Sequence, residues 1–596
     1  MRAPPRLDHG VIGNGRVLAL VSPTTAIDWL CLPRFDSPSV FASILDREHG
    51  GRWRILARDR EVTGRTSYLT NTNVLRTEVV DGDAAFEVID FAPRIRRGPD
   101  VDVPLELVRL VRPLRGEPRI TIDFAPRPDY GRGSGKLIPC EGGVEVEGAA
   151  GPIQMFTDIP RDYLGKEYAL RRPHHFVLHY GRRAGAPTTS EVRWLLDETV
   201  SGWRAWVKTC ALPTFAQEDV LRSALCLKLH AYHDTGAIIA AATTSIPEAM
   251  DTPRTWDYRY CWLRDAAFVV EAMRRLGYLN EGEQFIQFLR DVAEAGPLQP
   301  LYGIGGERDL EEIMLPHLAG FGGNGFVRIG NAAALQQQND LNGELILCLQ
   351  TLLTDPRLVV EDAQSFFALV RRLVEHAIET APKPDTSIWE FRSILRHYTF
   401  SRAMCWTAID RGSLLARKFG QHDLADQWAA IAESERRAVL EGGYDRERGF
   451  FTQARDSKHA DASNLLLPTL GIVDARDPRF LSTLDRYEQV LARRGLMLRY
   501  TNDDDFGETT SAFTICSFWW AEALALAGRL DDAIKVFEHV RKFANPLGLF
   551  SEDVDPSTGA LLGNFPQAYT HVGLIHAAVT IAELLEARDG RARAWT

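Results

Sequence analysis

The stretch Trp256–Asp265 (WDYRYCWLRD) packs two tryptophans, two tyrosines, two arginines and two aspartates into ten residues. A solvated loop rarely carries so much aromatic surface, and an apolar core cannot hold so much unpaired charge. Sugar binding uses both kinds of group, because a pyranose ring offers apolar C–H faces to aromatic rings and hydroxyls to carboxylates and guanidinium groups. The alternative is a structural Arg–Asp network beneath a helix N-terminus. We favour a carbohydrate site.

Beyond residue 200 the spacing of apolar residues predicts about twelve helices. We expect them over 218–233, 263–276, 280–294, 340–353, 361–380, 400–419, 424–440, 463–470, 478–493, 509–528, 531–543 and 567–588. The links after the even-numbered segments are short. Those after the odd-numbered segments are long, and they span 234–262, 295–339, 381–399, 441–462, 494–508 and 544–566.

This alternation of link lengths predicts the fold of the second part of the chain. Long loops in a compact domain are uncommon and usually functional. If the helices run up and down, every long loop lies at the same end, as six helical hairpins closed into an (α/α)6 barrel require. The long loops would then build one pocket at the mouth of the barrel. Trp256–Asp265 lies at the end of the first of these loops.

The first third of the chain has the pattern of an antiparallel β-sandwich. Asn14-Gly15 between two apolar runs predicts a tight hairpin, and Val74–Val80 pairs with Ala85–Phe91 around a second turn. Short strands separated by Gly and Pro are typical of sandwiches. Asp28–Asp36 mixes aromatic and charged residues, and we expect it to pack against the next domain. We therefore predict a β-sandwich domain over 1–200, a junction over 201–217 and a barrel catalytic domain over 218–596.

Composition narrows the possible partners. The net charge of −11 and the absence of Lys/Arg blocks argue against nucleic acid and anionic membranes as partners. The N-terminus lacks the apolar core of a signal peptide, and we expect no apolar run long enough to span a bilayer. Eight cysteines are scattered without a C-x-x-C pair, which favours a reduced compartment, most simply the cytoplasm. We expect a small carbohydrate as substrate and no metal or cofactor, and the oligomeric state stays open.

Two glutamates in later long loops are candidates for cleaving a glycosidic bond. Glu390 stands between Trp389 and Phe391, whose apolar surfaces are expected to raise its pKa, as a general acid needs. Glu552 is the first residue of a polar, acidic stretch, and we expect its carboxylate to stay ionised. Glycoside hydrolysis requires one carboxyl that holds a proton and one that is ionised. The alternative is that each is an ordinary solvated or helix-capping glutamate.

Three other patterns have simpler interpretations. Gly320–Gly325 and Gly330-Asn331, in the second long loop, resemble a dinucleotide motif, but no strand precedes them. We therefore expect a glycine-rich wall that lets a ligand approach the backbone. The acidic run Asn502–Glu508 lacks the full spacing of a calcium loop and is interpreted as a solvated turn. The helical histidines lack H-E-x-x-H spacing and are not expected to bind metal.

Taken together, Ile27–Pro38, Trp256–Asp265, Trp389-Glu390 and Phe550–Pro556 resemble the bacterial branch of glycoside hydrolase family 15, the glucoamylase and trehalase family. The resemblance covers nearly the whole chain. It implies a β-sandwich followed by an (α/α)6 barrel. It also implies an inverting, exo-acting hydrolase that releases β-glucose from the non-reducing end of an α-gluco-oligosaccharide or from trehalose.

The same resemblance assigns roles to particular residues. It implies that Glu390 is the general acid and Glu552 the general base. Arg264 and Asp265 would hold the hydroxyls of the terminal glucose. The residues expected to line that innermost subsite are Tyr258, Trp262 and Trp389. Fungal members place a second glutamate after the acid where this chain has Phe391, which leaves the preference for the leaving sugar open.

Two other classes of protein compete with this interpretation. A glycoside phosphorylase can share the sandwich-plus-barrel plan, but the acidic Glu552-Asp553 pair would repel phosphate. A non-catalytic sugar-binding protein would have no need to keep both carboxyls. The sequence therefore favours a hydrolase.

Overall fold

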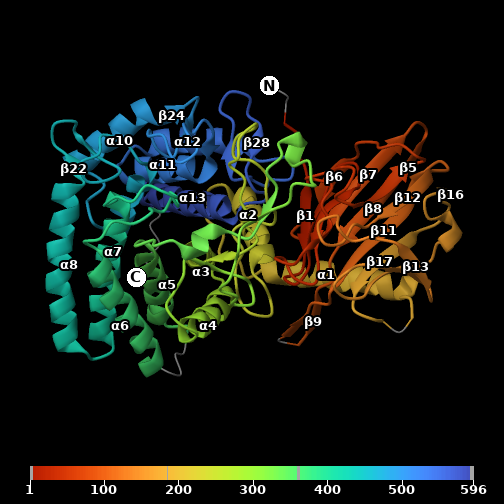
Figure 1. The fold of residues 1–596 in the computed structure, drawn as a ribbon, viewed down its shortest axis with the longest axis horizontal. Helices are drawn as coiled ribbons and strands as arrows, with labels where there is room; N and C mark the ends of the chain where they lie inside the picture. Colours follow the sequence, from red (N-terminus) through yellow and green to blue (C-terminus); the bar gives the residue numbers. More distant parts are fainter. Residues whose placement is uncertain (1–3, 99, 184, 359–362, 591–596) are drawn as a thin grey trace.

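The computed structural model describes residues 4–98, 100–183, 185–358 and 363–590, which form a β-sheet domain followed by a helical domain (Figure 1). The first sheet has the order β1 (Gly10–Gly13), β2 (Leu18–Val21), β3 (Ile27–Cys31), β5 (Arg52–Ala57), β12 (Arg119–Ala125) and β16 (Glu167–Ala169), with β4 (Ser39–Phe41) paired to β3. The second has the order β13 (Leu137–Cys140), β14 (Gly143–Val146), β15 (Ile153–Thr157), β17 (His174–Tyr180), β11 (Glu106–Arg115), β8 (Ala84–Phe91), β7 (Leu75–Asp81) and β6 (Arg65–Tyr68). A separate hairpin joins β9 (Ile95–Arg97) and β10 (Asp100–Asp102).

The two sheets pack face to face around an apolar core that contains a buried ion pair. Arg109 on β11 pairs with Asp90 on β8 at 2.7 Å and donates to the Trp53 carbonyl oxygen on the opposite sheet at 2.9 Å. The Trp53 ring also meets Phe176 of the second sheet edge-on, with ring centroids 6.2 Å apart. The predicted antiparallel sandwich is confirmed, including the hairpins β1–β2 and β7–β8.

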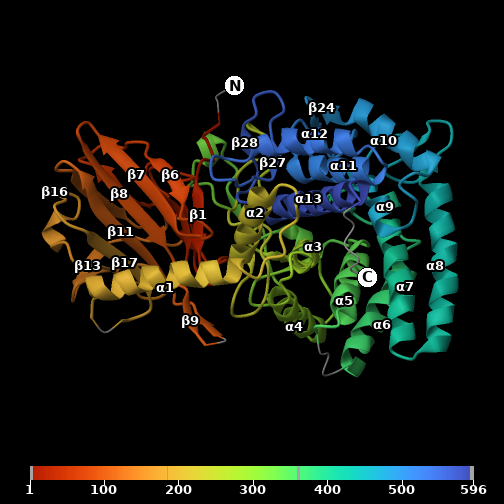
Figure 2. The ribbon, with the colours of Figure 1, turned by 180° about the vertical axis from the view of Figure 1, so that it is seen from behind.

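A long helix, α1 (Thr189–Val207), was not predicted. It lies alongside the sheets and leads toward the helical domain (Figure 2). Thr188 accepts the Glu191 backbone N–H while the Glu191 side chain accepts the Thr188 N–H, which satisfies two of the free donors at the helix N-terminus. Residue 200, where we expected the first domain to end, therefore lies inside a helix, and this T-x-x-E capping pattern was the signal available in the sequence.

The helical domain is an (α/α)6 barrel, as predicted. Its inner helices are α3 (Leu263–Arg275), α5 (Leu341–Thr354), α7 (Thr399–Lys418), α9 (Leu467–Leu470), α11 (Thr514–Leu526) and α13 (Ala568–Arg588). Each packs on the next, with the 3-10 turn η4 (Ala462–Leu466) joining α9 to α11, and α13 closes the ring on α3. The outer helices are α2 (Gln217–His230), α4 (Asn280–Glu294), α6 (Ala363–Thr380), α8 (His422–Gly442), α10 (Pro478–Val490) and α12 (Leu530–Val540).

Every inner helix follows a long loop, so the end of the barrel that carries the long loops is also where the inner helices begin. Short strand pairs stiffen these loops. They are β18 (Cys261–Trp262) with β19 (Leu301–Tyr302), β20 (Ile313–Met314) with β21 (Arg328–Ile329), β22 (Tyr444–Asp445) with β23 (Phe450–Phe451), and β24 (Ala492–Arg493) with β25 (Leu496–Met497). A three-stranded sheet joins β26 (Ala512–Phe513), β27 (Asp553–Val554) and β28 (Leu561–Leu562).

Helix α13 corrects one expectation. It has 21 residues, and an 18-residue window within it has a mean hydropathy of 1.3, which by length and composition alone would allow it to cross a membrane. The expectation that no apolar run reaches this length is therefore wrong. However, 83% of its apolar window is buried inside the protein, because α13 packs against α2, α3, α11 and α12. Its hydrophobicity is that of a core helix.

The β-domain is joined to the loops at the mouth of the barrel by buried polar contacts. Trp29 donates to the Ala242 carbonyl oxygen at 2.7 Å, and Asp36 accepts the backbone N–H of Ile304 at 3.0 Å. In the other direction, Arg259 reaches into the β-domain and donates to Tyr130 Oη at 2.8 Å. The expected packing of Asp28–Asp36 against the second domain is confirmed.

Candidate active site

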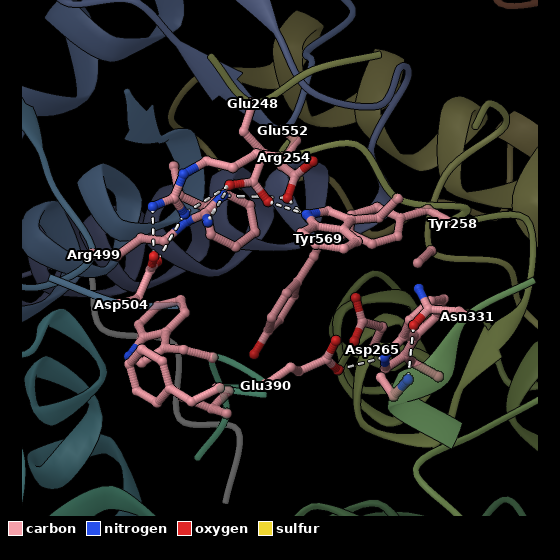
Figure 3. Close-up of a pocket in the computed structure, with 18 of the residues that line it drawn as sticks. Glu248, Arg254, Tyr258, Asp265, Asn331, Glu390, Arg499, Asp504, Glu552 and Tyr569 are labelled. Carbon is pink, nitrogen blue, oxygen red and sulfur yellow. Dashed lines mark hydrogen bonds and ion pairs between the residues drawn. The ribbon is translucent and has the colours of Figure 1, made fainter. Parts of the chain in front are cut away.

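A pocket at the loop-bearing end of the barrel contains both candidate acids (Figure 3). About 890 Å³ of it is free of protein atoms, and this space includes part of the open solvent. Side-chain exposure falls inward, from 34% at Arg392 to 19% at Glu390, 8% at Asp265 and 2% at Glu552. The residues proposed from the sequence all line it: Tyr258, Trp262, Arg264, Asp265, Trp389, Glu390 and Glu552.

The Glu390 carboxyl is held by polar donors. Its Oε1 accepts hydrogen bonds from the indole nitrogen of Trp262 at 2.6 Å, from Arg264 at 3.1 Å and from Gln338 at 3.2 Å. No residue in the described part of the chain donates to Oε2. One oxygen is therefore fixed by the protein, while the other remains available to a ligand.

The two neighbours of Glu390 in sequence do not surround its carboxyl. Glu390 has φ of 60°, a left-handed conformation that is costly for a residue with a side chain. Trp389 instead donates to both carboxylate oxygens of Asp461 at 2.9 Å, and Phe391 packs in a buried aromatic cluster against Tyr398. The expectation that the rings of Trp389 and Phe391 flank the Glu390 carboxyl is therefore wrong. In this turn, residues that are adjacent in sequence direct their side chains to different places.

Glu552 is buried, contrary to expectation. Its Oε1 accepts from Tyr258 Oη at 3.1 Å and from Arg499 at 3.3 Å, and its Oε2 accepts the Asn564 backbone N–H at 3.3 Å. Burial raises the pKa of Glu552 well above its usual range, and the neighbouring carboxyls of Glu248 and Asp553 raise it further. The polar stretch around Glu552 in sequence suggested a solvated carboxylate, but this stretch forms β27 and the turn before it, which are buried.

Glu248, Glu552 and Asp553 form a buried carboxyl cluster in which one oxygen of each lies within 4.8 Å of the others. This is the spacing of a metal site, but Arg499 already supplies a positive charge to all three. Its guanidinium donates to them at 2.8, 3.3 and 2.7 Å, respectively. Burial raises the pKa of Asp553, as it raises that of Glu552, while Arg499 lowers both. We interpret the cluster as an ion-pair network built around Arg499.

The deep end of the pocket offers free acceptor and donor atoms. Arg264 and Asp265 lie in the first turn of α3, and the guanidinium group of Arg264 lies 3.4 Å from Asp265 Oδ2 and 3.5 Å from Asp340. Burial raises the pKa of Asp265 to about 6. Asp265 Oδ2 and the Tyr569 hydroxyl are buried and form no hydrogen bond with any described residue. Buried polar atoms are nearly always satisfied, so these two are suited to sugar hydroxyls.

Several lining residues were not singled out from the sequence. Tyr569 occupies the first turn of α13 as Asp265 occupies the first turn of α3. Because it directly follows the sixth long loop, its position in the sequence was a usable signal. Arg499 and Tyr500 precede the acidic run in the fifth long loop, and their mixture of charge and aromatic surface was a usable signal. No comparable pattern marks Glu248.

Two motifs have roles other than those expected. Gly320–Gly325 does not line the pocket. A Cβ at Gly322 would lie 2.8 Å from Pro5 Cδ, so this turn packs on the N-terminal segment. The expected glycine-rich wall is therefore wrong for Gly320–Gly325, whereas Asn331 of the same loop does line the pocket. The acidic run is not simply solvated either, because Asp504 accepts two hydrogen bonds from Arg254 at 2.6 and 2.7 Å.

A pocket that places two carboxyl groups among aromatic rings and unsatisfied polar atoms, at the mouth of an (α/α)6 barrel, is the site of a glycoside hydrolase. Comparison with known proteins supports this class. Residues 214–579 match the model of glycosyl hydrolases family 15, and residues 2–159 match that of the trehalase-like N-terminal domain. The chain belongs to glycosyl hydrolases family 15 and is an inverting α-glucoside hydrolase.

Individual relatives match nearly the whole chain. The trehalase of Mycolicibacterium smegmatis is 36% identical over 98% of this chain and 92% of its own. The trehalase of Thermoplasma volcanium is 35% identical over 98% of this chain and 94% of its own. Among solved structures, a bacterial glucoamylase complexed with acarbose superposes with a TM-score of 0.73 at 15% identity, over 100% of this chain and 97% of that chain. This last likeness concerns the fold.

Proposed function

We propose that this enzyme is a trehalase, which hydrolyses trehalose to two glucose molecules. The observation that carries the proposal is the identity of 35–36% to trehalases over 98% of the chain. That range includes the β-domain, whose residues 2–159 match a trehalase-like family. If the similarity to trehalases were confined to the barrel, it would give weaker support for trehalose as the substrate.

In this proposal Glu390 protonates the glycosidic oxygen. Trp262, Arg264 and Gln338 hold Oε1, so the proton is carried on Oε2, which faces the substrate. The left-handed backbone at Glu390 directs the carboxyl into the pocket while its neighbours pack elsewhere. The same Arg264 binds the terminal glucose together with Asp265, so substrate binding and acid placement share one guanidinium group.

Glu552 is the proposed general base, which takes a proton from the attacking water. It acts in its ionised form, and Tyr258 and Arg499 stabilise that form by donating to Oε1. Burial raises the pKa of Tyr258 well above its usual range, so its hydroxyl keeps the hydrogen that it donates. The raised pKa of Glu552 makes it a stronger base once ionised, which suits proton abstraction from water.

A side-by-side assay of trehalose, maltose, isomaltose and maltotetraose tests the substrate. With inversion, one ring of trehalose leaves as β-glucose while the other keeps its α configuration. NMR of the first turnovers is therefore expected to show both anomers in equal amounts. Hydrolysis of maltose or isomaltose without hydrolysis of trehalose would instead favour a glucoamylase-type enzyme.

The phosphorylase alternative has a separate test. Arg499 and Arg254 line the pocket, but carboxylates already pair with both, so neither is free to bind phosphate. We expect added phosphate to yield glucose and no sugar phosphate. Formation of glucose 1-phosphate would support the alternative.

We also propose that the enzyme works in a reducing compartment, most simply the cytoplasm. All eight cysteines are free thiols, and six of them are buried. Burial raises the pKa of Cys261 to about 12, which keeps it protonated and unreactive. Fractionation of the native host, with the enzyme assayed in each fraction, tests this proposal.

A further inference from the structure

The acidic run that we interpreted as a solvated turn is tied to the loop that carries Glu390. Asp505 accepts the backbone N–H of Arg392 at 2.6 Å and that of Ser393 at 2.9 Å, and it also accepts the Ser393 hydroxyl. One carboxylate therefore joins the third and fifth long loops directly after the proposed acid. Charge-assisted hydrogen bonds of this kind are about twice as strong as neutral ones.

The Arg392 side chain extends this connection to the first and second long loops. Its guanidinium pairs with Glu312 at 2.7 and 3.2 Å and lies 4.6 Å from the centre of the Trp256 ring. Phe506, next to Asp505, packs edge-on against the same ring at 5.3 Å. Four loops thus meet in one group of contacts, which we call the rim: Trp256, Glu312, Arg392, Asp505 and Phe506.

The rim lies at the outer end of the pocket. Four of its members, all except Glu312, line the pocket, and Arg392 is more exposed than Glu390 or any residue at the deep end. The terminal glucose is expected at that deep end, beside Arg264 and Asp265. We place the second sugar, beyond the scissile bond, between the acids and the rim, so that a third sugar would have to pass through the rim.

We propose that the rim limits the substrate to one sugar unit beyond the scissile bond, so that the enzyme acts on disaccharides. A longer chain is rejected because it would have to separate Arg392 from Glu312 and from the Trp256 ring, which the shorter substrate leaves in place. The proposal rests on the proposed hydrolysis of α-glucosides. It holds whether the preferred disaccharide is trehalose or another α-linked glucose pair.

Two matched pairs of substrates test the length limit. One pair is trehalose and a trisaccharide made of trehalose with a further α-1,4-linked glucose on one ring; the other is maltose and maltotriose. We compare kcat/KM within each pair for the wild type, Arg392→Ala, Asp505→Ala and the control Arg396→Ala. Arg396 is exposed on the same loop and is absent from the pocket.

We expect the wild type and Arg396→Ala to favour the disaccharide by roughly 10-fold or more in kcat/KM. This is the lower end of the discrimination between substrates that the shape of a pocket provides. Arg392→Ala and Asp505→Ala are expected to bring this ratio close to one, mainly by raising kcat/KM for the trisaccharide. Equal rates on both members of a pair in the wild type, or an unchanged ratio in both rim variants, would overturn the proposal. Loss of trehalose hydrolysis with a length limit retained on maltose would instead overturn the proposed substrate and leave the rim intact.

Discussion

Trp262 donates its indole hydrogen to Oε1 of Glu390 at 2.6 Å. Four residues earlier, Tyr258 donates to Oε1 of Glu552 at 3.1 Å. One short segment therefore contacts both candidate acids, although these lie on two different loops. The intervening Arg259 faces away from the pocket and holds the segment against the β-domain. The geometry of the two carboxyls thus depends on a segment that both domains fix in place.

Removal of either carboxyl is expected to stop catalysis without unfolding the protein. Positioned acids and bases typically contribute ~10²–10⁴-fold to rate. We expect Glu390→Gln and Glu552→Gln each to lower kcat by at least the lower end of this range. Steady-state kinetics on trehalose, with circular dichroism to check folding, measures the effect. A folded variant with near-wild-type turnover would remove that residue from its role.

Gly563 keeps space for Glu552. It has φ of 69°, and a Cβ there would lie 2.6 Å from Glu552 Cβ and 2.7 Å from its Oε2. A shift of about 1 Å in a catalytic group can cost roughly 10²-fold in rate, and we expect a loss of this size in kcat for Gly563→Ala. Gly559→Ala is the matched control, because Gly559 has φ of 76° and its nearest neighbour, Phe543, is 3.6 Å away. Equal losses in both variants would show that only backbone strain matters.

The contact between Arg259 and the β-domain is expected to contribute to the stability of the protein. Arg259 is fully buried and pairs with Asp257 at 2.6 Å. Arg259→Met leaves that carboxylate buried and unpaired, which typically costs about 3–5 kcal/mol. Tyr130→Phe removes a single hydrogen bond to the same guanidinium, and a cost of about 1.5–3 kcal/mol is expected. Denaturant unfolding measures both, and the prediction is contradicted if Tyr130→Phe is the more damaging.

The pH dependence of catalysis is expected to change when the charge of Glu248 is removed. The base acts when ionised, so kcat/KM rises with pH through the pKa of Glu552. Burial raises that pKa most, and the charge of Glu248 raises it next, while Arg499 lowers it. Glu248→Gln therefore moves the acid limb of the pH profile to lower pH. Glu508→Gln, at an exposed carboxyl in the acidic run, serves as control and is expected to leave the limb unchanged.

Asp385 is expected to make the fold more stable at low pH than at high pH. Burial raises its pKa to about 7 from 3.8. An acid whose pKa is raised by folding contributes stability below its unfolded pKa and loses it as pH rises through the folded value. Between pH 4 and 7 the wild type should therefore lose stability relative to Asp385→Asn, on the order of 4 kcal/mol for a shift of this size. Unfolding of both proteins at several pH values measures the difference, and a constant difference would contradict it.

Most of the fold followed from patterns that repeat along the chain. The lengths of the links between helices predicted the barrel and the end at which its pocket lies. Alternating apolar residues and Asn14-Gly15 predicted the sandwich. The helix α1 was missed because it follows strands and precedes no long loop, although Thr188 and Glu191 mark its start.

The sequence predicted part of the candidate site, but it missed Glu248, Arg499 and Tyr569, and it did not predict the surroundings of the two acids. Glu390 and Glu552 line one pocket, as their placement on equivalent loops implied. Their environments were inferred from sequence neighbours, and both inferences failed. The left-handed backbone of Glu390 directs the side chains of its neighbours away from its carboxyl. At Glu552, the neighbouring carboxyl of Glu248 comes from a loop some 300 positions earlier in the sequence. Contacts between distant loops determine the surroundings of both carboxyls, and these contacts cannot be inferred from a local sequence pattern.

The direction of the inner helices has an electrostatic consequence for the pocket. A helix of several turns carries roughly half a positive charge at its N-terminus, and the five long inner helices, α3, α5, α7, α11 and α13, begin at the end where the carboxyls gather. Their dipoles therefore oppose the accumulated negative charge of the acids. If the chain followed the same ring in the opposite direction, the negative ends of these five helices would face those acids, and a site this rich in carboxyls would be harder to keep ionised.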